Sequence, residues 1–206
     1  MLSIAVFASG RGSNFQALTE AISKRNIDAK IVVVISNNSD AGALALARSF
    51  HIPALHLSQK HFPSKDAFTQ AILSALESHG ADFIVLAGYM KKIDPAVVLR
   101  YRNRIINVHP ALLPAFGGQG MFGHHVHEAV IAQHESVSGA TVHIVDNDFD
   151  HGSIVLQESI PVDPNDTPEI LAAKVLRIEH RLLPRAVELF ACKKITVEDG
   201  NVHIHD

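Results

Sequence analysis

The chain has 206 residues, of which 47% are hydrophobic and 19% charged, the composition of an ordinary globular protein rather than a disordered or fibrous one. Its length is enough to bury one sizeable core, so we expect a single domain spanning residues 1–206. The formal net charge of −3 lacks the basic excess of a nucleic-acid or membrane-surface binder, and the single cysteine, Cys192, excludes an internal disulfide.

Residues 2–8 form an apolar run that predicts a buried strand. The run lacks the basic region that opens a signal peptide, and no apolar run reaches the roughly 18 residues of a membrane-spanning helix. We therefore expect a cytoplasmic protein. A glycine-containing loop follows this strand and leads into a helical pattern with Phe15, Leu18 and Ile22 on one face.

That loop, Gly10-Arg11-Gly12-Ser13-Asn14, is a candidate anion site. Backbone N–H groups at the positive end of the following helix can bind a phosphate. The loop is not a dinucleotide fingerprint, because Phe15 stands where the third glycine belongs and the second strand ends Ser36-Asn37-Asn38 without an acid. A plain tight turn is the alternative interpretation.

The middle of the chain alternates short apolar runs with helical patterns. In order, these predict a strand over 30–36, a helix over 41–50, a strand over 53–57, a helix over 65–79, a strand over 82–87, a helix opened by Asp94-Pro95, and a strand over 105–109. Such alternation predicts an α/β fold with a parallel sheet and helices on both faces.

The strand over 105–109 carries two polar side chains near its end. Asn107 and His109 are two residues apart, so their side chains share one face of the strand, and Pro110 ends the strand directly after them. An amide and an imidazole there could stabilise a transient negative charge and move a proton. A hydrogen-bonded histidine without a catalytic role is the alternative.

Residues 115–123 contain four glycines, which indicates a mobile loop and a candidate lid. Strands are then predicted over 138–145 and 153–162, pairing antiparallel at one side of the sheet. A long helix is expected after Thr167-Pro168, kinked or split at Pro184, and a terminal hairpin over 195–197 and 202–204.

Asp150 lies in the connection between the two late strands, and a carboxylate beside His109 would orient and stabilise its imidazolium. Two other interpretations of this acidic stretch are a solvated turn and a calcium loop. Calcium is disfavoured because His151 and Gln157 stand where an EF-hand loop requires glycine and glutamate.

Histidines are unusually frequent, 14 in all, and several crowd into one segment: His124, His125, His127 and His134. Such a cluster could bind zinc or iron. Neither a helical H-E-x-x-H motif nor a cysteine pair supports a metal site, so we expect none.

Together these stretches resemble one family, the folate-dependent formyltransferases. Five motifs in the same order carry the resemblance over nearly the whole chain: residues 8–14, 85–90, 107–114, 143–145 and 150–154. The resemblance implies a single-domain, Rossmann-like fold with a mostly parallel sheet and an antiparallel edge. It also implies formyl transfer from the co-substrate 10-formyltetrahydrofolate to the amine of glycinamide ribonucleotide, in purine biosynthesis, by a monomer or homodimer.

The resemblance also implies roles for individual residues. The phosphate of the ribonucleotide would be held by Gly12, Ser13 and Asn14, and its ribose by Glu179. The catalytic group would be Asn107, His109 and Asp150. The folate would contact Asn107 and a strip formed by Met90, Lys91, Lys92 and Ile93. Lys65 would be a basic residue near the glutamate tail of the folate.

The glycine lid with His125 and His127 resembles the family's mobile loop. Three features depart from the common pattern: Ala111 replaces a frequent serine, Lys91 replaces a frequent arginine, and the lid is longer. These departures concern the folate contacts and loop closure more than the chemistry.

Alternatives within the family are another folate-dependent formyltransferase and formyltetrahydrofolate hydrolase. The hydrolase and the formyl-methionyl-tRNA enzyme carry extra domains, for which we expect no room in 206 residues. From other classes, a metal-dependent hydrolase using the histidine cluster and a non-catalytic phosphate sensor remain open.

Overall fold

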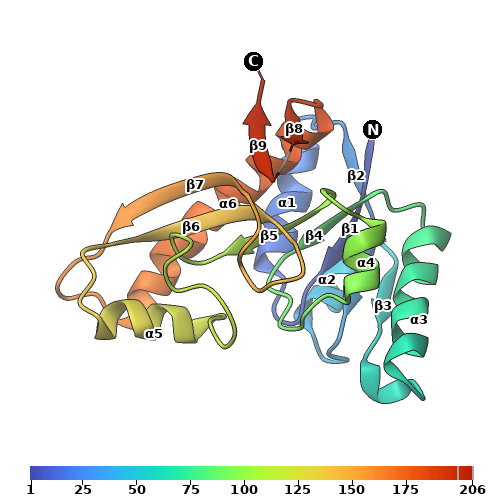
Figure 1. Ribbon diagram of the computed structural model, residues 1–206, viewed down its shortest axis with the longest axis horizontal. Helices are drawn as coiled ribbons and strands as arrows, with labels where there is room; N and C mark the ends of the chain where they lie inside the picture. The colour runs from blue at the N-terminus through green and yellow to red at the C-terminus, as the bar shows by residue number, and fades with distance from the viewer. Residues whose placement is uncertain (199, 206) are drawn as a thin grey trace.

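The computed structural model of the protein describes residues 1–198 and 200–205, which form a seven-stranded sheet and a separate two-stranded hairpin (Figure 1). The order in the large sheet is β3-β2-β1-β4-β5-β6-β7. Strands β1 to β5 are parallel to one another, whereas β6 pairs antiparallel with β5, and β7 pairs antiparallel with β6. The bounds are β1 Leu2–Phe7, β2 Ala29–Ser36, β3 Ala54–His56, β4 Phe83–Leu86, β5 Ile105–His109, β6 Val137–Ile144, β7 Ile154–Pro161, β8 Ile195–Glu198 and β9 Asn201–Ile204.

Helices cover both faces of this sheet. Their bounds are α1 Ser13–Lys24, α2 Gly42–Ser49, α3 Lys65–Ser78, α4 Pro95–Arg100, α5 His124–Ala132 and α6 Pro168–Ala191, with a 3₁₀ turn at Gln59–His61. The predicted α/β fold, with a mostly parallel sheet and an antiparallel edge, is confirmed. Within the described residues, no helix has both the length and the apolar character needed to cross a membrane.

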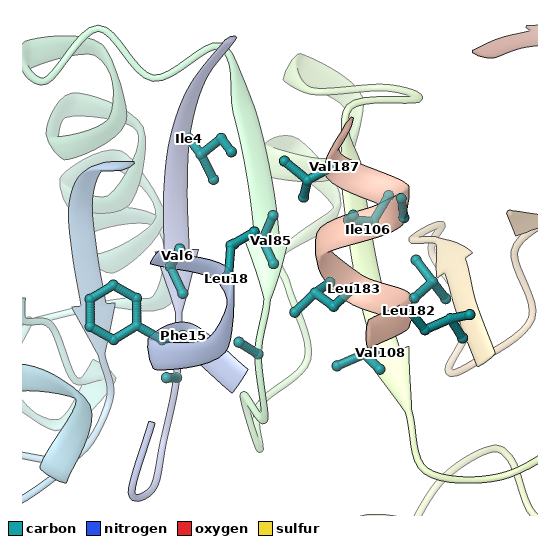
Figure 2. Packing of buried hydrophobic residues seen from close by; sticks show 14 of the residues in the cluster. Ile4, Val6, Phe15, Leu18, Val85, Ile106, Val108, Leu182, Leu183 and Val187 are labelled. Carbon is teal, nitrogen blue, oxygen red and sulfur yellow. The ribbon is translucent and has the colours of Figure 1, made fainter. Parts of the chain in front are cut away.

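The alternation of side chains along β1 explains the two layers of helices. Ile4 and Val6 belong to a buried cluster with α1, α2 and α6, whereas Ala5 and Phe7 belong to a cluster with α3 and α4. Figure 2 shows Val187 of α6 directed toward the sheet in the first cluster. A strand buried on both faces reads as a continuous apolar run, which is why residues 2–8 were recognisable from sequence.

The order of the strands creates a crevice at the carboxyl ends of the parallel strands. After β1 the chain builds β2 and β3 on one side, then returns to place β4 and β5 on the other side of β1. Ligands of open α/β sheets bind where the strand order reverses in this way. The loops that follow β1 and β4 are joined there, because Met90 N–H donates to Ser9 Oγ at 2.8 Å.

Two features differ from the sequence-based expectation. Helix α6 runs unbroken from Pro168 to Ala191, so Pro184 does not split it, and the alternative of a kink at Pro184 stays a prediction. One missing backbone hydrogen bond is offset because Leu183, Pro184 and Val187 are buried against the sheet. Helix α5 had no predicted bounds, since it follows Gly123 without a side-chain cap in a histidine-rich segment.

The antiparallel β6–β7 pairing depends on Gly139. A Cβ atom at this position would collide with the carbonyl oxygen of Glu158 on β7 and with the side chain of Leu112. We expect Gly139→Ala to lower the free energy of unfolding by about 1–3 kcal/mol, measured by chemical denaturation. Gly10→Ala is the control, because a Cβ at Gly10 meets no heavy atom within 4 Å; equal stability of the two variants would contradict the prediction.

Candidate functional site

A cleft of about 940 Å³ opens at the crevice between the parallel strands and the late antiparallel part. Its wall includes Gly12, Ser13, Asn14 and Glu179 from the predicted phosphate and ribose side. It also includes Asn107, His109 and Asp150, together with the strip Met90, Lys91, Lys92 and Ile93. The structure therefore brings all but one of the predicted site residues to one cavity.

Lys65 is the exception. It begins α3, and its ammonium pairs with the carboxylate of Asp94 at 2.9 Å. Lys65 is not among the residues of the described chain that line the cleft. Its predicted folate contact remains a prediction.

The glycine loop adopts a conformation that other residues rarely adopt. Gly12 precedes α1 with φ of 85°, and a Cβ atom there would lie 2.8 Å from Cα of Ala43. The loop is held against α2, since Ala43 N–H donates to the Gly10 carbonyl at 3.1 Å. Glycine is thus required for the loop to turn into α1 while packed on α2.

Behind this loop, Asn14 on α1 contacts Glu179 on α6. Asn14 Nδ2 donates to Glu179 Oε2 at 2.5 Å, and Asn14 Oδ1 is buried without a partner among the described residues. Burial raises the pKa of Glu179 to about 7, and the Asn14 hydrogen bond opposes this only partly. Near neutral pH this carboxyl group can therefore donate as well as accept a hydrogen bond.

Asn107 and His109 lie on the same face at the end of β5, as predicted, and β6 adds a third polar group beside them. The antiparallel register places His143 directly opposite Asn107. Asn107 Nδ2 lies 3.1 Å from His143 Nε2 and 3.5 Å from Asp150 Oδ1. His143 appeared in the sequence analysis only as part of a motif, without a role, because its cross-strand partner is 36 residues away.

The two ring nitrogens of His109 have different partners. Nε2 lies 2.8 Å from the carbonyl oxygen of Phe116, which can only accept, so Nε2 carries a hydrogen. Nδ1 lies 3.6 Å from Asp150 Oδ2. Burial lowers the pKa of His109 below its ordinary value, while the Asp150 carboxylate and the Phe116 carbonyl oppose the decrease. A proton can therefore be gained or lost at Nδ1, beside Asp150.

Asp150 reaches the site from the β6–β7 connection with a left-handed backbone, φ 55°. Its Oδ2 accepts a hydrogen bond from the Gly118 backbone N–H at 3.0 Å. Burial raises the pKa of Asp150, but the polar groups around the carboxylate, His109 and the Gly118 amide among them, outweigh burial and hold the pKa below its ordinary value. The carboxyl group is therefore ionised where it meets His109.

The glycine-rich loop of residues 115–123 contacts this centre through its backbone, by the Phe116 carbonyl and the Gly118 amide. Of the two lid histidines, His127 on α5 is 5% exposed and lines the cleft, and burial lowers its pKa to about 4. His125 instead points away and pairs with Glu128. Among residues 1–198 and 200–205, no three His, Cys, Asp or Glu side chains gather as a metal would require.

Comparison with known proteins identifies the family. The model of the family described as formyl transferase matches residues 2–187. The chain belongs to the formyl transferase family.

Several relatives of this formyl transferase carry more specific names. Phosphoribosylglycinamide formyltransferase of Bacillus subtilis is 37% identical over 91% of this chain and 94% of its own length. The chloroplastic phosphoribosylglycinamide formyltransferase of Arabidopsis thaliana is 41% identical over 96% of this chain and 68% of its own length. The crystal structure of glycinamide ribonucleotide transformylase 1 from Symbiobacterium toebii has a TM-score of 0.94 at 37% identity, covering 100% of this chain and 95% of that one.

The buried carboxyl group of this formyl transferase predicts a pH dependence of stability. Unfolded Glu179 loses its proton near pH 4.5, whereas folded Glu179 loses it near 7. The folded state therefore binds this proton more tightly, so the stability contributed by Glu179 falls as pH rises from 4.5 to 7 and is constant above.

Glu179→Gln should remove this loss, which is on the order of 3 kcal/mol. Denaturant unfolding at pH 4.5 and pH 8 would measure it, with Glu77→Gln at an exposed position of α3 as the control. If Glu179→Gln gains no stability relative to wild type between the two pH values, the buried carboxyl group is not neutral in the folded state.

Proposed function

We propose that the chain transfers the formyl group of 10-formyltetrahydrofolate to the amine of glycinamide ribonucleotide. The products are N-formylglycinamide ribonucleotide and tetrahydrofolate, in de novo purine biosynthesis. The observation that carries the proposal is that the glycine loop and the polar group of Asn107, His109 and Asp150 open into one cleft. The names of the Bacillus and Arabidopsis relatives support this choice of substrates.

In this proposal the two substrates enter from opposite sides of the polar group. The phosphate of the ribonucleotide lies on the backbone of Gly12, Ser13 and Asn14 at the N-terminus of α1, and Glu179 contacts the ribose. The folate lies along Met90, Lys91, Lys92 and Ile93 and reaches Asn107. The exposed side chains of Met90 and Phe149 supply apolar surface on that side of the cleft.

The chemistry is a direct transfer. The amine nitrogen attacks the formyl carbon, and the carbonyl oxygen becomes an oxyanion in a tetrahedral intermediate. An N–H of Asn107 and the protonated Nδ1 of His109 donate to this oxygen. The intermediate then collapses as the bond from the formyl carbon to the folate nitrogen breaks.

A proton must also move, from the attacking amine to the leaving folate nitrogen. Asp150 lines the cleft beside His109, with its ionised carboxyl group 3.6 Å from Nδ1 of His109. It keeps His109 oriented and favours its protonated form, and it can hold a water molecule that relays the proton. The oligomeric state proposed is a monomer or homodimer, the location is the cytoplasm, and residues 1–206 are one domain.

The test is a spectroscopic assay of tetrahydrofolate release from 10-formyltetrahydrofolate, with and without glycinamide ribonucleotide. We expect release only when the ribonucleotide is present. Release at the same rate without it would indicate a hydrolase. Binding of both ligands without any release would indicate a sensor, and loss of release on treatment with a chelator would indicate a metal-dependent enzyme.

His109→Ala should lower kcat by about a hundredfold or more, because it removes an oxyanion donor and a proton carrier. The KM values for both substrates should change little, since the side chain acts mainly in the transition state. His203→Ala on the exposed hairpin is the matched control. Near-normal turnover of His109→Ala would refute the catalytic role.

Asp150→Asn should also act mainly on kcat, and it should change the pH profile. Because the Asp150 carboxylate raises the pKa of His109, its removal lowers that pKa, and less His109 is protonated at a given pH. Residual activity should therefore recover toward lower pH than in wild type. Steady-state rates across pH measure this. An unshifted pH profile together with a normal kcat would refute a catalytic role for Asp150.

A further inference from the structure

His143 is a buried histidine, 2% exposed, that the proposed chemistry does not use. It stands on β6 opposite Asn107, and the β6–β7 register is irregular between Val142 and His143. Irregularities of this kind often redirect side chains next to active sites. The imidazole lies within hydrogen-bond distance of Asn107 on one side and of its own strand on the other.

The partners of His143 determine where its proton lies. Nδ1 is 2.9 Å from the carbonyl oxygen of Ile144, and a carbonyl can only accept, so Nδ1 carries the hydrogen. Nε2 is 3.1 Å from the Asn107 amide nitrogen, which can only donate, so Nε2 presents a lone pair. Nε2 also lies 3.6 Å from Asp150 Oδ1, which is beyond hydrogen-bond distance, so the closer Asn107 amide determines the state of Nε2. We therefore assign His143 as a neutral Nδ1–H imidazole.

The Asp150 carboxylate confirms which end of the Asn107 amide faces His143. Asp150 Oδ1 lies 3.5 Å from the same amide nitrogen. An amide oxygen in that position would face a carboxylate oxygen, which is repulsive. With one Asn107 hydrogen bonded to His143, the second is directed toward Asp150, which lines the cleft.

We propose that His143 is a positioning residue, which fixes the amide of Asn107 so that an N–H rather than the carbonyl oxygen faces the reacting formyl group. This inference rests on the proposed function for its kinetic consequence. Asn107 cannot be oriented by its backbone alone, because the amide group can turn about its last side-chain bond and exchange its oxygen and nitrogen. The acceptor at His143 Nε2 removes that freedom before the substrates bind.

The loop around Gly152 fixes the position of the Ile144 carbonyl, which accepts the hydrogen bond from His143 Nδ1. Gly152 passes so close to the Ile144 carbonyl that a Cβ atom there would collide with it. Ile144 N–H donates to the Ser153 carbonyl at 2.9 Å, which holds this return of the chain in place. The carbonyl that sets the tautomer of His143 is therefore fixed by the same connection that carries Asp150.

The kinetic experiment compares three variants of the full chain. His143→Leu removes the acceptor, and His143→Gln replaces it with an amide oxygen that can reach the same place. Val142→Ala is the control, since it destabilises the opposite, buried face of the same strand. We expect His143→Leu to lower kcat about tenfold or more with KM changed less than about threefold. His143→Gln should recover part of the loss, and Val142→Ala should keep kcat near that of wild type.

A double-variant cycle separates positioning from an independent role. In an Asn107→Ala background, His143→Leu should lower kcat by less than about threefold further, because there is no amide left to orient. Losses that multiply in the double variant, or a His143→Gln variant as slow as His143→Leu, would overturn the proposal. Wild-type turnover is measured first, so failure of the proposed function is seen separately as absence of wild-type formyl transfer.

A measurement on the unmodified enzyme keeps the proposal testable even if His143→Leu does not fold. Nitrogen-15 chemical shifts of labelled histidine distinguish the two neutral tautomers and the cation. The His143 signals, assigned by their absence in His143→Gln, should be those of the Nδ1–H tautomer at neutral pH. An Nε2–H tautomer or a doubly protonated ring would overturn the assignment.

Discussion

The antiparallel pairing of β5 with β6 is the constraint on which the candidate site depends. The parallel strands alone would bring loops together at their carboxyl ends, but only one polar strand end, that of β5, would face the cleft. By running back along β5, strand β6 sets His143 opposite Asn107. Its turn into β7 then returns Asp150 to within 3.6 Å of His109. One change of strand direction thus assembles a compact polar group from segments more than 30 residues apart.

Burial raises the pKa of both carboxyl groups of this cleft, but their neighbours make the net shifts opposite. For Glu179 it is nearly unopposed, and the pKa of the carboxyl group rises to about 7. For Asp150 it is outweighed by the polar groups around it, His109 and the Gly118 amide among them, so the negative charge is retained. The two carboxyl groups share one cavity but differ in the number of donors around them. The cleft therefore has a carboxyl group with a pKa of about 7 on the side of the glycine loop and an ionised carboxylate beside His109.

Much of the fold could be predicted from sequence because the signals are local. The apolar run over 2–8, the cap at Thr167 and the two-residue spacing of Asn107 and His109 each depend on neighbouring residues alone. The partnership of Asp150 with His109 came from the family resemblance, since no local pattern encodes it. His143 was missed for the same reason, and Pro184 does not split α6 because tertiary packing outweighs the local tendency of proline to break a helix.

The lid contacts the polar group through a carbonyl oxygen and an amide N–H, at Phe116 and Gly118, and not through side chains. Every amino acid except proline offers both groups, so these two hydrogen bonds do not require particular side chains in most of the lid. It does depend on how many residues separate the two positions from β5 and on their left-handed backbone, with φ of 55° and 98°. The spacing of these two positions from β5 and the glycine at residue 118, more than the other side chains of the lid, thus set whether His109 and Asp150 are held together.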